Sequence, residues 1–417
     1  MMIKIAGILF FLIPLKPVAA QVLKLNAVLD SISAFHPVIK MYNNEIRSMD
    51  EAAKGAKSWM PPEFSSGFWM TPYNPALWKK GDMGATGMGQ YMIGGQQMLP
   101  NKKKQNADAA YMEAMSSVEK EKKNATLNEL LNDAKQLYYE WIFLKRKLSI
   151  LEQNEKLLDF MIKNAELRYK NGLEKISAYY KAKAALGKVK NMQLMYANDI
   201  REKRIRINAL MGRNALTNFD VDTSYQLKKY SSLVFDSTLF YTNRSDLKAI
   251  DKDIAITLLK QETERQSLQP QFGVRYEHMF GFGGLPMQFS LMGMLKLPLT
   301  KWSSKMNKAN IESLKWKANA LQSQKEMMVN EYSGMAYSMQ NELALKQQQI
   351  QLYDENIIPA LKNNYKTIQL GYEQNTEELF MLYDAWESLN MTQLEYAELL
   401  NQSLKLQVSI DRLIEKK

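Results

Sequence analysis

The feature that most constrains the fold is a long proline-free stretch from Asn101 to about Tyr169. Its apolar residues recur at spacings of three and four, which places one apolar stripe along a helix. The stripe consists of Leu127, Leu130, Leu131, Ala134, Leu137, Tyr138, Trp141 and Leu144. At a rise of 1.5 Å per residue, about 65 helical residues extend for about 100 Å. Such a helix does not fit a compact domain, so we expect an elongated, mainly helical protein.

The two halves of the chain repeat one order of predicted elements: helix, two short strand-like runs, long helix, shorter helix. The predicted helices cover about 27–57, 101–169 and 175–211 in the first half, and about 246–267, 303–372 and 376–417 in the second. Pro359 should kink the second long helix, because proline cannot donate a helical hydrogen bond.

Matching landmarks in the two halves lie at similar intervals, which argues for an internal duplication. The separations are 208 residues from Pro62 to Pro270, 198 from Pro100 to Pro298 and 203 from Gly172 to Asn375. We expect repeats at 21–213 and 246–417, joined by a polar, aromatic and irregular linker at 214–245.

The N-terminus has the layout of a cleavable secretory signal. Lys4 precedes an apolar run from Ile5 to Leu15, and small residues end at Ala20. The run is shorter than the 18 or so residues of a spanning helix. We therefore expect residues 1–20 to be a signal peptide and the mature chain to be exported.

The strand-like runs alternate between apolar and polar residues. Each half offers one hairpin, at about 60–73 with 88–99 and at about 271–280 with 287–299. In the second hairpin one face carries Phe272, Val274, Tyr276, His278, Phe280, Met287, Phe289, Leu291, Leu295, Leu297 and Leu299. This pattern is typical of a transmembrane β-strand between lipid and water. The alternative is a pair of hairpins packed on a soluble core.

Four strands cannot close into a barrel, and open strand edges are not tolerated in lipid. Single-chain barrels begin at about eight strands. A barrel built from this chain must therefore be shared between copies. Two, three or four copies would give 8, 12 or 16 strands, and strand counting does not choose among them.

Taken together, these elements resemble the TolC family of outer-membrane efflux proteins over the whole mature chain. The most specific residues are the two predicted helix turns, Arg168-Tyr169-Lys170-Asn171-Gly172 with Ser177, and Gly371-Tyr372-Glu373-Gln374-Asn375 followed by Leu382-Tyr383-Asp384-Ala385. Leu210-Met211-Gly212, which closes the first half, and the proline beside each strand pair are further similarities.

The resemblance implies a homotrimer that supplies a 12-strand barrel in the outer membrane and a long α-helical barrel in the periplasm. The helix turns would dock on a periplasmic adaptor, which links the channel to an inner-membrane pump. The expected docking residues are Arg168, Gly172, Ser177, Gly371 and Asn375. Asn375 replaces the usual glycine, but asparagine also tolerates a positive φ.

The resemblance also implies a periplasmic gate lined by acidic residues. Asp384 matches the second acidic position of the family, whereas Met381 occupies the first. Glu377 and Glu378 could supply the missing charge. Alternatively, these acids only favour the N-terminus of a helix through its dipole.

Methionine is abundant, with 27 residues, and several lie in the hairpins. Alternation predicts that one group points to the polar side of the strands, toward the lumen: Met88, Met92, Met98, Met279, Met292 and Met294. Thioethers favour soft cations such as Cu(I), which suggests efflux of copper or silver. The alternatives are methionine as apolar filler and a duct for organic toxins, antibiotics or proteins.

Composition argues against other classes of function. The chain has no Cys and two His, which excludes disulfides and thiolate sites and leaves little for His-based catalysis. Neither a nucleophile elbow nor a phosphate loop is present, so we predict no enzyme and no cofactor. The net charge of +11 is scattered among acids, so nucleic acid is not an expected partner. A structural periplasmic coiled coil would explain the helices but not the alternating hairpins.

Overall fold

The computed structural model describes residues 21–415, except 82–83, 229, 231–233 and 299. The predicted signal peptide, 1–20, and Leu299 lie outside the described residues. The chain divides into two compact units. The first, called the turn unit here, contains 21–37, Asn128–Val234 and Tyr337–Arg412. The second, called the strand unit, contains Val38–Leu127, Phe235–Ala336 and the residues from Leu413 on.

The predicted fold class, mainly helical with a small β part, is confirmed. The helices of the first half are α1 (Leu25–Phe35), α2 (Pro37–Lys54), α3 (Lys102–Lys170) and α4 (Ile176–Leu210). Those of the second half are α5 (Ser237–Asn243), α6 (Ser245–Gln266), α7 (Lys301–Leu352), α8 (Ile358–Glu373) and α9 (Leu379–Leu413). A short 3-10 turn, η1 (Pro75–Trp78), follows the first strand of the large sheet.

Two helices depart from the predicted bounds, and proline is the cause in both cases. The single helix expected over 27–57 is two helices, because His36 is extended and Pro37 begins α2. The kink was expected at Pro359. The structure has one turn of π-helix, Tyr353–Ile357, which leads directly into α8, and Pro359 lies in the first turn of α8. Proline has no N–H to donate to a helical carbonyl, so the regular hydrogen-bond pattern of the helix is interrupted just before it.

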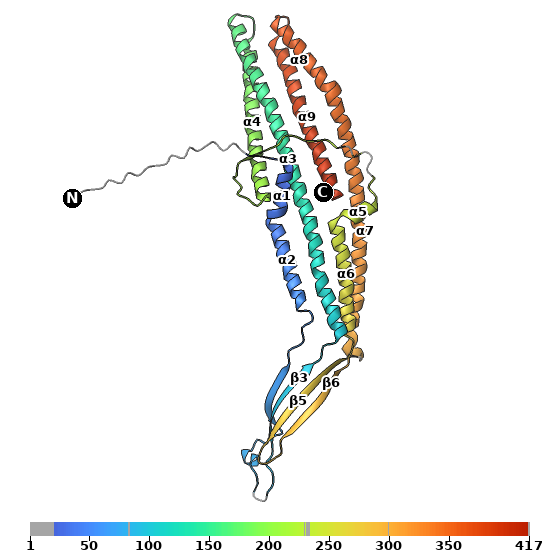
Figure 1. Cartoon of the computed structure of the whole chain (residues 1–417). Helices are drawn as coiled ribbons and strands as arrows, with labels where there is room; N and C mark the ends of the chain where they lie inside the picture. Colours follow the sequence, from blue (N-terminus) through green and yellow to red (C-terminus); the bar gives the residue numbers. More distant parts are fainter. Residues whose placement is uncertain (1–20, 82–83, 229, 231–233, 299, 416–417) are drawn as a thin grey trace, which may run out of the picture. The chain divides into compact units, whose positions relative to one another are not determined.

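The strand unit holds a four-stranded antiparallel sheet, whose strands lie side by side in Figure 1. Its strands are β2 (Glu63–Trp69), β3 (Gln90–Met98), β5 (Gln271–Gly281) and β6 (Gln288–Lys296), in the order β2-β3-β5-β6. The two predicted hairpins therefore pair with each other through β3 and β5, and β2 and β6 form the two edges of the sheet.

The turn unit contains a small sheet that the sequence did not predict. β1 (Gln21–Leu23) pairs in parallel with β4 (Phe219–Val221), which lies within the linker. The phenol of Tyr138 on α3 donates a hydrogen bond to the Leu23 carbonyl at 2.8 Å, and Phe219 is buried against Trp141. The linker, expected to be irregular, therefore contributes β4 to this unit, while its last part forms α5 in the strand unit.

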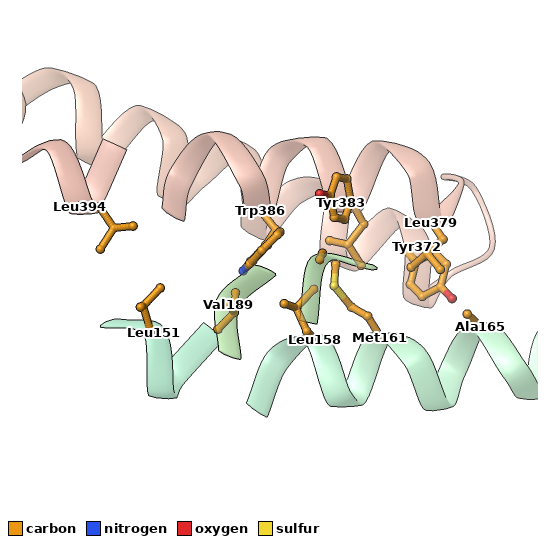
Figure 2. Packing of buried hydrophobic residues seen from close by; sticks show 12 residues of the cluster. Leu151, Leu158, Met161, Ala165, Val189, Tyr372, Leu379, Tyr383, Trp386 and Leu394 are labelled. Atoms are coloured by element: carbon orange, nitrogen blue, oxygen red, sulfur yellow. The ribbon is translucent and has the colours of Figure 1, made fainter. Parts of the chain in front are cut away.

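The core of the turn unit joins two helical hairpins. α4 folds back along α3, and α9 folds back along α8 (Figure 1). Tyr383 and Trp386 of α9 belong to one buried cluster with Leu158 and Met161 of α3, seen from close by in Figure 2. All four side chains are buried, so apolar burial holds the two hairpins together. Across the described part of the chain, no helix combines the length and apolarity that crossing a membrane requires.

Candidate functional site

The large sheet has one apolar face, which is exposed. The register places ten exposed apolar side chains on this face: Phe64, Phe68, Ile93, Phe272, Val274, Tyr276, Phe280, Phe289, Leu291 and Leu295. Phe64 is 81% exposed and Leu291 is 67% exposed. An apolar patch of this extent on a single chain marks a surface for lipid or another protein.

The opposite face of the sheet is polar. It carries Glu63, Ser65, Gln90, Gln96, Arg275, Glu277, Gln288 and Ser290 together with five methionines. Glu277 is only 5% exposed and forms an ion pair with Arg275. Gly94 lies opposite Glu277, and its missing side chain makes room for the Glu277 chain, since a Cβ there would lie 2.9 Å from Glu277 Cγ.

The register brings five of the six predicted methionines to the polar face, in two groups. Met92 lies directly opposite Met279 near the loop end of the sheet. Met98 and Met294 lie on either side of Gly273 at the other end, and Met292 lies opposite Arg275. The ionic residues separate the two groups.

Met88 does not belong to this arrangement, which corrects the prediction that it shares the alternation of β3. It precedes the strand, and Gly89 between them has a φ of +99°. A positive φ ends the alternation. Met88 is also mostly exposed.

Aromatic residues lie at the loop end of the sheet. Trp78 stacks on Phe282 with ring centres 5.4 Å apart, and Phe68 contacts both rings. The Gly87 amide donates to the Gly283 carbonyl at 2.8 Å, so the loops of the two hairpins are joined. This contact could not be predicted from the sequence, because it depends on how β3 and β5 pair.

The two helix turns, defined as residues 171–175 and 374–378, adopt the predicted conformation. Gly172 has a φ of +70° and Asn375 a φ of +62°, which confirms that asparagine takes the left-handed conformation. The turns share a cavity of about 390 Å³, lined in part by Arg168, Glu377 and Glu378. Arg168 lies over the Tyr372 ring and donates to its carbonyl at 3.0 Å.

With its folded-back helix pairs and four-stranded sheet, this chain is similar in fold to solved membrane proteins. The outer-membrane channel OprN superposes with a TM-score of 0.76 at 12% identity, over 94% of this chain and 90% of that chain. A membrane protein from Pseudomonas aeruginosa gives 0.76 at 12% over 96% and 95%. The outer membrane protein VceC from Vibrio cholerae gives 0.73 at 13% over 94% and 95%.

This chain has the fold of the TolC-like outer-membrane channels. The resemblance first noted at the two helix turns is thereby confirmed at the level of the fold. Comparing the sequence with protein-family models and with curated proteins gives no match. The TolC-like fold is therefore carried by the order of helices and strands, while the individual side chains differ.

Within the TolC-like fold, the three predicted gate acids occupy two places. Glu377 and Glu378 lie in the turn before α9, and the Glu378 carbonyl accepts the amides of Met381 and Leu382. Asp384 lies further along α9 and pairs with Lys181 of α4 at 3.0 Å.

Lys181 is the residue at this place that the sequence did not single out. Its ammonium lies 3.4 Å from the centre of the Phe380 ring and 4.3 Å from that of Tyr383. Burial, with a contribution from Glu387, raises the pKa of Tyr383 to about 12, so its phenol stays neutral beside the cation. The contact could not be predicted, because α4 and α9 are distant in sequence.

The remaining predicted turn residues have less defined surroundings. Ser177 is exposed in the first turn of α4. Gly371 packs against the following turn, where a Cβ would lie 2.6 Å from Glu377 Cγ. Among the described residues, no three His, Asp or Glu side chains gather where they could hold a metal ion.

Proposed function

We propose that the chain is a subunit of an outer-membrane channel that passively conducts substrates expelled by an inner-membrane pump, with no enzymatic activity. The observation that carries the proposal is the large sheet, exposed and apolar on one face and polar on the other. A strand with these two faces suits a barrel wall between lipid and water. The helical part would extend into the periplasm.

We further propose that three copies share a barrel of 12 strands. β2 and β6 are edge strands in this chain, and lipid requires that their backbone groups be paired. One face of α7, which follows β6, also supports association, because Trp302 and Trp316 are 83% and 68% exposed there. Cyclic symmetry would repeat each contact three times.

The helix turns are the proposed docking site for a periplasmic adaptor. Arg168, Gly172 and Asn375 line the cavity between the turns. Gly371 packs against Glu377 in the second turn, and Ser177 is exposed in the first turn of α4. Nearby, Lys181 and Asp384 join α4 to α9 and are the proposed closing contact of the gate. Glu377 and Glu378 would add negative charge at the entrance.

For the cargo we propose soft monovalent cations, copper or silver, because five thioethers lie on the polar face of the sheet. Growth of a deletion strain across copper, silver, zinc and antibiotic series tests the cargo. Loss of copper and silver tolerance alone is expected. Lost antibiotic tolerance with unchanged metal tolerance would show an organic cargo and contradict the cation proposal.

Conduction itself is tested with the purified full chain in planar lipid bilayers. The proposal predicts discrete conductance steps of uniform size. A protein that leaves the cell envelope without detergent and produces no steps would instead be a structural periplasmic coiled coil.

A further inference from the structure

Two methionines converge on one glycine at the helix-proximal end of the large sheet. The register places Met98 of β3 and Met294 of β6 on either side of Gly273 of β5. A Cβ at Gly273 would lie 2.6 Å from the Met98 sulfur and 2.9 Å from the Met294 methyl carbon. Both thioether ends therefore occupy the space that any other residue at position 273 would fill.

A cavity of about 130 Å³ adjoins this pair. Met98 lines it together with Met60, which precedes β2. The amide group of Gln97 donates to the Met60 carbonyl at 2.9 Å, which ties the Met60 backbone to β3. The polar part of the wall comes from Ser58, Asn101, Lys104, Gln105, Asp108 and Gln271. The cavity thus offers two thioethers, amide oxygens and one carboxylate, opposed by one ammonium group.

This donor set matches one class of ion. Neutral thioethers bind soft cations such as Cu(I), whereas hard divalent cations prefer oxygen ligands. With a single carboxylate and no histidine in the wall, Ca²⁺, Mg²⁺ and Zn²⁺ lack the ligands they require.

We propose that Met98 and Met294, gathered over Gly273, and Met60 across the adjoining cavity form a binding site for Cu(I) or Ag(I). The role of the site is to hold the cargo at the point where the helices meet the sheet, and only this role rests on the proposed function. Binding itself requires only this arrangement of side chains. Gly273 is the residue that keeps the site open.

The test is Ag(I) titration by calorimetry of the full chain purified in detergent, with Cu(I) competition against a chromophoric chelator as a second probe. Met98→Leu/Met294→Leu keeps the volume and removes both sulfurs. We expect it to lose one Ag(I) per chain, or to bind that ion at least about tenfold more weakly. Gly273→Val should have the same effect with every sulfur retained.

Met306→Leu is the matched control, because Met306 is 71% exposed on α7 of the same unit and should leave the titration unchanged. Zn(II) should bind at this site neither in the wild type nor in the variants. The assembly mass of each variant shows that it is folded, and Gly273→Ala is a milder substitute if Gly273→Val does not assemble.

Unchanged Ag(I) stoichiometry and affinity in Met98→Leu/Met294→Leu would overturn the site. Bilayer conductance of the same samples separates the two proposals. A wild-type protein that conducts but binds no Ag(I) overturns the site alone. One that binds Ag(I) at this site but never conducts overturns the channel and leaves the site in place.

Discussion

Lys181 Nζ lies 3.0 Å from Asp384 Oδ1, and this ion pair joins α4 to α9. The same nitrogen contacts the faces of the Phe380 and Tyr383 rings. An isolated, partly exposed ion pair contributes little. A cation over the face of an aromatic ring adds about 0.5–1 kcal/mol. The pair is therefore suited to hold two helical hairpins together reversibly.

Replacing Lys181 by Met should loosen the proposed gate. The substitution keeps the apolar stem and removes the charge. Losing about 1 kcal/mol from the closed state raises the ratio of open to closed channels about fivefold. Single-channel recording measures this ratio directly.

Lys183→Met is the matched control. Lys183 lies on the same helix but is exposed, and its ammonium is near a single ring, at the longer distance of 5.8 Å from the ring centre. It should leave the open fraction unchanged. Equal open fractions in wild type and Lys181→Met would remove the gate role from this pair.

A buried amide network sets how α3 packs on α9. Asn154 accepts from the Trp386 indole at 2.7 Å and donates to Asn390 at 2.6 Å. Asn154→Ala leaves the Trp386 N–H donor and the Asn390 carbonyl acceptor buried without their hydrogen-bond partner. Each buried unpaired group costs about 1–3 kcal/mol, so the free energy of unfolding should fall by at least about 2 kcal/mol. Denaturant unfolding measures the loss, and Asn191→Ala on the exposed side of α4 should change it by less than about 0.5 kcal/mol.

The strand unit should lose stability in acid through Asp246. Burial raises the pKa of Asp246, but hydrogen bonds from Arg244 and Tyr332 outweigh burial and leave the pKa below its ordinary value. Because the pKa is lowered on folding, the stabilisation is present above the unfolded value of about 4 and is lost as the pH falls through the folded value. Unfolding measured between pH 5 and pH 2 should show this loss.

Asp246→Asn should flatten that pH profile and lower stability at pH 7 by about 3 kcal/mol, because it leaves the buried Arg244 charge without its partner. Asp251→Asn is the matched control in the same helix. Asp251 pairs with Lys325 at a half-exposed position, so its removal should cost less than about 1 kcal/mol. If Asp246→Asn loses stability between pH 5 and pH 2 as the wild type does, Asp246 is not the cause of that loss.

The second helix turn depends on the backbone of Asn375, whose φ is +62°. Asn375→Ala should destabilise the turn by about 1 kcal/mol, since residues with a Cβ avoid this conformation, whereas Asn375→Gly should not. Hydrogen exchange of residues 374–378 reports the local change. Asn364→Ala, at an exposed position within α8, is the control and should not increase exchange in the turn. Equal effects of Asn375→Ala, Asn375→Gly and Asn364→Ala would argue against backbone strain at position 375.

Much of the fold could be predicted because local patterns dictate it. The proline-free run predicted α3 to within one residue at each end. Gly172 and Gly212 follow the helices that they were expected to end. The strands were recognised by alternation, which also assigned Met92 and Met279 to one face. These features depend on neighbours in sequence.

The parts that were missed depend on contacts between distant segments. β4 pairs with β1 across about 200 residues of sequence, and Tyr138 of α3 hydrogen-bonds Leu23 of β1 and Asp222, which follows β4. Lys181 acquires its role from Asp384, about 200 residues away in sequence. Met88 was misplaced because alternation was extended across Gly89, whose positive φ is invisible without the backbone.

The central claim is that this chain builds a channel only by sharing its four strands with other copies. The mass of the assembly extracted from the outer membrane, measured by native mass spectrometry, tests it most directly. Three chains in a detergent-dependent complex are expected. A single chain released without detergent would contradict it.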